Sequence, residues 1–138
     1  MPDFRLGFAA AVLLISAIAA LAQDGAPTLD CEKAKAQPDL NDCAYRDYEA
    51  ADADLNAEYR KALAKARMLD GEYGGQPLAV DALKSAQRAW IGYRDGQCVL
   101  AGLQARGGQA EAMLVSGCLA ELTRSRTQEL REFAEREG

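Results

Sequence analysis

Four cysteines are the residues with the clearest chemical potential in this chain: Cys31, Cys43, Cys98 and Cys118. An even number of cysteines predicts disulfide bonds in an exported chain, and the first 22 residues have the pattern of a signal peptide for export. Of the three possible pairings we expect Cys31–Cys43 and Cys98–Cys118, because these pairs are nearest in sequence. A zinc site is the alternative, but the sequence holds no Cys-x-x-Cys motif and no histidine, so we expect no metal.

Catalytic chemistry has little support in the sequence. The commonest general base is missing because there is no histidine, and oxidised cysteines cannot act as nucleophiles. Ser85, Ser116 and Ser125 lie in no recognisable activating motif. Carboxylates are plentiful, but nothing marks a pair of the kind that glycosidases use. We therefore expect no catalytic residues and no enzyme.

Two patterns imitate ligand sites without completing them. Asp52, Asp54 and Asn56 resemble the start of a calcium loop, but Ala57 and Leu63 stand where an EF-hand needs glycine and glutamate. The glycine-rich stretches GEYGGQP and ARGGQAE follow no predicted strand and lack the Gly-Lys-Ser/Thr ending of a phosphate loop. Both stretches indicate turns, and no cofactor is expected.

Residues 86–98, AQRAWIGYRDGQC, combine the single tryptophan with arginines, an aspartate and glycines. On a helix Trp90 and Arg94 are one turn apart and can stack. Each glycine lowers helix propensity by about 1 kcal/mol relative to alanine, so we expect a packing reason for both. A stripe of small residues would allow another helix to approach closely: Ser85, Ala89, Gly92 and Gly96.

Three charged residues fall on or beside predicted buried faces. Our hypothesis is that Asp52, Arg94 and Arg126 form a charge network across helices. Removal of Asp52 from such a network would leave an arginine unpaired and cost several kcal/mol. The alternative is that each side chain reaches solvent, as long arginines do readily.

The elements that must position these residues are helices. Apolar residues three and four apart predict a first helix from about residue 41 to 69, with Asn41 or Asp42 as its N-cap. The stretch DGEYGGQP, residues 70–77, ends it. The expected buried face is Tyr45, Tyr48, Asp52, Leu55, Tyr59, Ala62, Ala66 and Leu69.

Two further helices are predicted, from about residue 78 to 101 and from 111 to 135, around a glycine-rich turn at 102–109. We therefore expect an all-α fold, a small disulfide-bonded bundle of three main helices running up, down and up. A Cys98–Cys118 bond would close the last hairpin and add about 2–4 kcal/mol. The expected buried faces are Leu83, Ala86, Trp90, Tyr93 and Gln97, then Val115, Cys118, Leu122, Arg126, Leu130 and Phe133.

The first 22 residues have the pattern of a secretory signal peptide. A short polar start with Arg5 precedes an apolar run, and Ala20-Leu21-Ala22 supplies a small-residue cleavage site. Cleavage leaves about 116 residues, one domain's worth. We divide these into an N-terminal lead-in at 23–40 and a helical domain at 41–138. We expect a periplasmic or secreted protein without a stable membrane anchor, because no cysteine follows the cleavage site.

The formal net charge is −5, and loss of Asp3 and Arg5 with the signal peptide leaves it unchanged. An acidic domain lacks the basic surface that nucleic acid requires, so no nucleic-acid partner is expected. Electrostatic steering would favour a basic protein partner. The alternative is that the charge only maintains solubility.

Four segments in order resemble the LprI-type lysozyme-inhibitor family: NDCAYRDYEAADADLNAEYRKAL, AQRAWIGYRDGQC, a Gly-Gly turn, and CLAELTRSRTQEL. Together they cover roughly Cys31 to Leu130. The most specific piece is the second, which we call the signature segment. Its signature residues are Gln87, Arg88, Trp90, Tyr93, Arg94 and Asp95.

This resemblance implies an all-helical, disulfide-bonded domain of the cell envelope at residues 41–138, and inhibition of lysozyme-type muramidases. A basic lysozyme-type glycosidase is the implied partner. No motif marks the residues that bind it, and by exposure alone the turns at 71–77 and 102–109 are the candidates. The alternative function is a periplasmic interaction or envelope-stress module that does not inhibit lysozyme.

Overall fold

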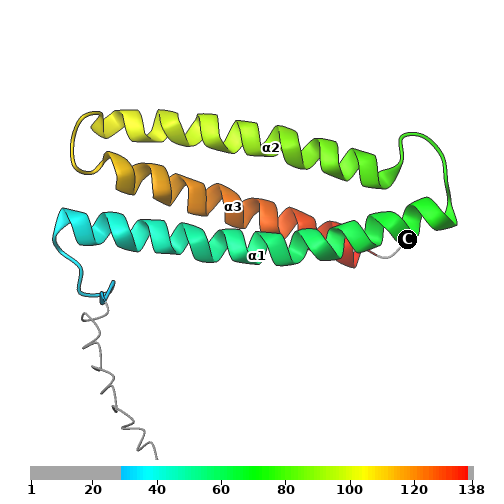
Figure 1. Ribbon diagram of the computed structural model, residues 1–138, viewed down its shortest axis with the longest axis horizontal. Coiled ribbons are helices and arrows are strands. Elements are labelled where there is room, and N and C mark those ends of the chain that lie inside the picture. The colour runs from blue at the N-terminus through cyan, green and yellow to red at the C-terminus, as the bar shows by residue number, and fades with distance from the viewer. Residues whose placement is uncertain (1–28, 137–138) are drawn as a thin grey trace, which may run out of the picture.

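The computed structural model describes residues 29–136, and within this range it contains three long helices and no strand. Helix α1 spans Gln37–Glu72, α2 spans Ala79–Gly102 and α3 spans Glu111–Glu135, with a short 3₁₀ helix η1 at Leu103–Ala105. The helices run up, down and up (Figure 1). The prediction of an all-α fold of three helices is confirmed. The expected signal peptide at 1–22 lies outside the described residues.

Helix α1 begins earlier than predicted. Its N-cap is Ala36, which makes no side-chain cap hydrogen bond, and Pro38 occupies the first turn, where proline needs no hydrogen-bond partner. The predicted N-cap at Asn41 or Asp42 is therefore wrong, and the helix includes residues 37–40 of the expected lead-in. Asn41 instead donates its side-chain amide to the backbone oxygen of Gln109, at 3.0 Å, which ties α1 to the turn before α3.

The turn between α1 and α2 is held by Asp70, a residue of α1. Its carboxylate accepts hydrogen bonds from the backbone amides of Ala79 and Val80, at 2.5 and 3.1 Å. These are orphan donors of the first turn of α2, so Asp70 caps α2 from outside it. Gly74 and Gly75 adopt positive φ angles that only glycine accepts without strain, and the chain reverses there.

The core lies mainly between α1 and α3, which make the most extensive helix contact. The α1 face is built from Ala51, Leu55, Ala62 and Ala66, as the predicted periodicity requires at the last three positions. The α3 face differs from the prediction, because apart from Leu130 its buried residues are small or polar. They are Ser116, Ala120, Thr123 and Thr127. Small residues on both sides let the two backbones approach closely.

Helix α2 packs less extensively on the other two, and its buried face is not the one predicted. Leu83 is buried as expected, but Ala86 and Gln97 are exposed and Tyr93 is 59% exposed. The buried face of α2 is therefore rotated about the helix axis relative to the prediction. Arg94 and the disulfide-bonded Cys98 point inward in place of Tyr93 and Gln97. The buried residues of α2 are Leu83, Gln87, Arg94, Cys98 and Gly102.

The small-residue stripe of α2 does not serve helix packing within the chain. A Cβ atom added at Gly92 or Gly96 would meet nothing within 4 Å. Close approach occurs instead at Gly102, where an added Cβ would lie 2.5 Å from the Cγ2 of Val115 on α3. The glycine that packing requires is therefore the one that ends the helix, not the pair inside the signature segment.

These glycines give opposite predictions for stability. Gly92→Ala and Gly96→Ala should each raise the free energy of unfolding by about 0.5–1 kcal/mol, because alanine stabilises a helix interior and meets no neighbour here. Gly102→Ala should lower it by about 1–3 kcal/mol through overpacking against Val115. Urea denaturation of the three variants measures both effects. Destabilisation by Gly92→Ala or Gly96→Ala would contradict the outward orientation of this face.

Candidate functional site

The signature segment, residues 86–98, lies entirely within α2, and its residues point in different directions. Gln87 and Arg94 are buried, Trp90 is half-buried, and Arg88, Tyr93 and Asp95 are exposed. Gln87 accepts a hydrogen bond through its Oε1 from the Nε of Arg126 on α3, at 3.1 Å. One face of this helical segment therefore contacts the rest of the bundle, and the opposite face is exposed to solvent.

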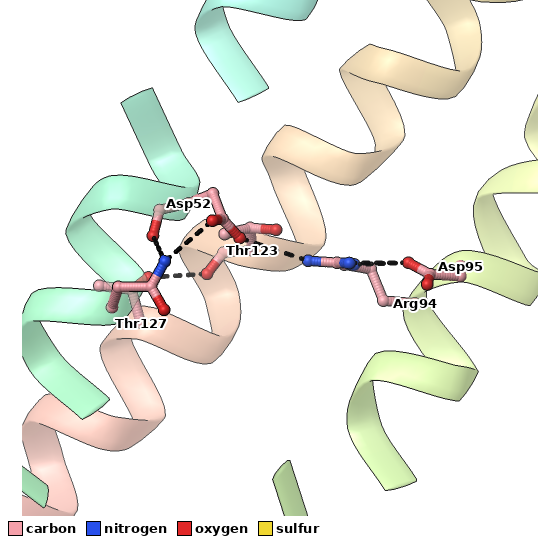
Figure 2. Close-up of polar contacts among 6 residues, drawn as sticks. Asp52, Arg94, Asp95, Thr123 and Thr127 are labelled. Atoms are coloured by element: carbon pink, nitrogen blue, oxygen red, sulfur yellow. Dashed lines mark hydrogen bonds and ion pairs between the residues drawn. The ribbon is translucent and has the colours of Figure 1, made fainter. Parts of the chain in front are cut away.

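Arg94 is the central residue of this segment. It is only 8% exposed, and its guanidinium carbon lies 5.0 Å from the Trp90 ring centroid and 5.6 Å from that of Tyr48 on α1. Asp95 accepts hydrogen bonds from it at 2.8 Å, and Asp52 on α1 lies 3.6 Å away (Figure 2). Two aromatic faces and two carboxylates thus replace water around one buried charge.

Arg126 does not join this group, which corrects the expected network of three. Its Nη1 pairs with Glu129, one turn along the same helix, at 2.7 Å, and its Nε reaches Gln87. The structure brings Asp52 and Arg94 together and leaves Arg126 in a separate contact between α2 and α3. Arg126 lies on the side of α3 that faces the start of α2, with Leu83 and Phe133. Besides the Asp70 cap, two distinct polar side-chain links therefore connect α2 to its neighbours.

Glu58 is a buried charge that the sequence reasoning missed. It is 7% exposed, and its Oε1 accepts from Lys61 at 2.9 Å and faces Arg131 of α3 at 3.6 Å. The hydrogen bond from Lys61, with the positive charges of Lys61 and Arg131, holds the pKa of this carboxyl below its ordinary value. The signal was present in the sequence, because Glu58 falls three and four residues from Leu55 and Ala62 on the buried stripe.

A cleft separates α1 from α2 beside the signature segment. It has a volume of about 320 Å³ and is lined by side chains that include Asp52, Tyr59, Trp90 and Arg94. Among its polar lining residues, Asp52 pairs with Arg94 and accepts a hydrogen bond from Asn56. Among residues 29–136 no group of three or more potential ligands is placed to hold a metal ion. The arrangement holds helices together.

A second hollow, which we call the Tyr45 groove, lies at the disulfide end of the bundle. It has a volume of about 580 Å³ and is open to solvent. Its lining residues are Tyr45, Gly108, Gln109, Glu111, Ala112, Val115, Ser116 and Leu119. The turn at 102–109, one of the two candidates for partner contact, forms one end of this groove. The other candidate, at 71–77, lies at the opposite end of the bundle (Figure 1).

Both disulfides lie at the same end of the molecule as the Tyr45 groove. One joins Cys31 to Cys43 across 12 residues, and the other joins Cys98 to Cys118 across 20 residues. The first ties the segment before α1 to its second turn. The second joins α2 to α3 beside the glycine-rich turn. These are the pairs nearest in sequence, and the end they join is the one where α1, the turn at 102–109 and α3 meet.

The fold and its two disulfides define a small disulfide-bonded three-helix domain, and comparison with known proteins identifies its family. The family model described as lysozyme inhibitor LprI matches residues 30–130, so the chain belongs to this family. An uncharacterized protein of Rhizobium meliloti (strain 1021) is 56% identical over 131 residues, which cover 92% of this chain and 94% of that protein. No solved structure matches the chain.

The geometry around Arg94 lowers the loss of stability that we expect when Asp52 is removed. Asp52→Ala should lower the free energy of unfolding by less than about 1 kcal/mol, because the Asp52 side chain is 38% exposed and Asp95 still neutralises Arg94. Arg94→Ala should cost about 1–3 kcal/mol, since it also removes the packing on two aromatic rings. Urea denaturation of both variants measures this. An equal loss of stability in the two variants would contradict this account and show that Asp52 is the essential partner of Arg94.

Proposed function

We propose that this domain binds and inhibits a lysozyme-type muramidase and is not itself an enzyme. The observation that carries the proposal is membership of the LprI family over residues 30–130, which include all three helices nearly to the end of α3. The family is described by lysozyme inhibition. The relative with 56% identity carries no assigned activity, so the proposal needs a direct test.

The charge of the domain supports a basic partner. The net charge is −5, and residues 39–54 alone carry six acidic residues against one arginine, a local charge of 1 − 6 = −5. We call residues 39–54 the acidic segment. They form the first half of α1, so the negative potential is concentrated at one end of the molecule. Such a field steers a positively charged protein towards that end and raises the association rate.

We place the inhibitor in the periplasm or outside the cell. This rests on the signal-peptide pattern of residues 1–22 and on two disulfides, which persist in oxidising compartments. None of the helices described in residues 29–136 is long and apolar enough to cross a membrane. Lysozyme-type enzymes act on cell-wall glycan outside the cytoplasmic membrane, so inhibitor and target would share a compartment.

The test is a titration of the oxidised mature domain, residues 23–138, into a cell-wall turbidity assay with hen egg-white lysozyme. We expect dose-dependent inhibition that weakens at least about tenfold between about 20 and 300 mM salt, because the attraction between unlike charges is screened. A panel of other lysozymes serves as a second arm. Absence of inhibition and binding across the panel would reject the proposal and favour an envelope module without this activity.

A further inference from the structure

The Tyr45 groove is an apolar hollow on an otherwise strongly charged end of the molecule. Tyr45 lies on α1 and is 50% exposed. Facing it on α3 are the aliphatic side chains of Ala112, Val115 and Leu119. Gly108 and Gln109 form the end of the groove, in the turn that precedes α3. An exposed phenol ring beside aliphatic side chains offers a surface on which another apolar or amphipathic side chain can lie.

The groove has an acidic rim. Asp42 and Glu49 lie three residues before and four residues after Tyr45 on α1, so they occupy the same helix face one turn away on each side. Glu111 lines the groove from α3 and accepts a hydrogen bond from the backbone amide of Gly107, at 2.8 Å. All of these carboxylates except Glu111 belong to the acidic segment, which carries a charge equal to that of the whole chain.

Three of the six carboxylates of the acidic segment form ion pairs with other described residues. Asp42 pairs with Arg46 at 2.7 Å, Asp47 with Arg124 of α3, and Asp52 with Arg94 of α2. Glu49 makes no ion pair with any residue between 29 and 136, and it shares this with Asp39 and Asp54. Of these three unpaired carboxylates, Glu49 is the one that lies one helical turn from Tyr45, and it is exposed and available to a cation from outside.

We propose that the Tyr45 groove is the docking site for a basic segment of the partner, a loop that presents a lysine or arginine side chain. This inference rests on the proposed function and assigns its contact surface. The aliphatic stem of the cationic side chain lies on Tyr45 and Val115, and the charged head pairs with Glu49. Lysine and arginine bury their stems on apolar surfaces in this way and are attracted to aromatic faces.

Charge favours this occupant over a second copy of the chain. Two copies that met at this end would bring together two segments of charge −5, which repel. A basic protein is attracted instead of repelled. Its positive charge is complementary to the acidic rim during approach, and its lysine or arginine side chain pairs with the rim after contact. The rim thus accelerates encounter, and the apolar floor slows dissociation.

The experiment compares groove variants with variants of matched chemistry elsewhere. Glu49→Lys and Tyr45→Ser alter the groove. Asp54→Lys makes the same change of charge five residues further along α1, on a different face, and Tyr73→Ser removes an exposed tyrosine from the opposite end of the bundle. All four positions are exposed, and circular dichroism melts verify that each variant is folded. Affinity for hen egg-white lysozyme is measured by biolayer interferometry with the oxidised mature domain.

We expect each groove variant to weaken binding at least about tenfold, and each control variant less than about threefold. Asp54→Lys removes as much net charge as Glu49→Lys, so the difference between them isolates local contact from long-range steering. If the domain binds lysozyme and the groove variants bind as well as the controls, the groove proposal is wrong and the proposed function stands.

A second arm tests the groove without lysozyme. The ¹⁵N-labelled domain is titrated with the peptide acetyl-Leu-Arg-Leu-Lys-amide, and amide chemical shifts are followed. We expect shifts concentrated at residues 42–49 and 108–119, reduced in Glu49→Lys. Such shifts without lysozyme binding would reject the proposed function alone. Absence of shifts in the groove, or a dimer that Tyr45→Ser disrupts in sedimentation, would overturn the docking proposal.

Discussion

The close contact between α1 and α3 is the constraint on which the rest of the structure depends. The two helices meet through side chains no larger than threonine over most of the seam: Ala51, Ala62 and Ala66 on α1, and Ser116, Ala120, Thr123 and Thr127 on α3. Thr127 donates its hydroxyl to the backbone oxygen of Thr123, so it satisfies its own polar group within α3 (Figure 2). The hydroxyl of Thr123, which is also buried in the seam, has no hydrogen-bond partner among the described residues, so small size rather than polarity accounts for these threonines.

Helix α2 packs on the outside of the α1–α3 pair and makes less extensive contacts with either helix than they make with each other. The Cys98–Cys118 bond fixes one end, Asp70 caps the other, and Arg94 reaches across to α1 between them. A long, lightly packed helix leaves hollows beside it, and the cleft along the signature segment is one of them. The signature residues thus explain how α2 is held. The surface proposed for partner contact lies elsewhere, where the first half of α1 meets the start of α3.

The sequence was sufficient for the number and order of helices, because apolar periodicity and glycine-rich breaks are local signals. It was insufficient to predict which face of each helix is buried. The α3 seam was missed because Ser116, Thr123 and Thr127 count as polar, although small size is what that seam requires. Helical spacing predicts Tyr93 on the buried face, because aromatic residues are usually buried, but Arg94 is the buried residue and its neighbours neutralise its charge.

Native-state hydrogen exchange of the oxidised domain tests the central claim, that α1 and α3 form the stable frame and α2 is secondary. Amides of the buried seam at residues 51–66 and 116–130 should exchange only through global unfolding, with one common free energy. Amides at 82–92 of α2 should exchange through a smaller opening, at a free energy at least about 1 kcal/mol lower. Equal protection of α2 and the α1–α3 seam would contradict the account.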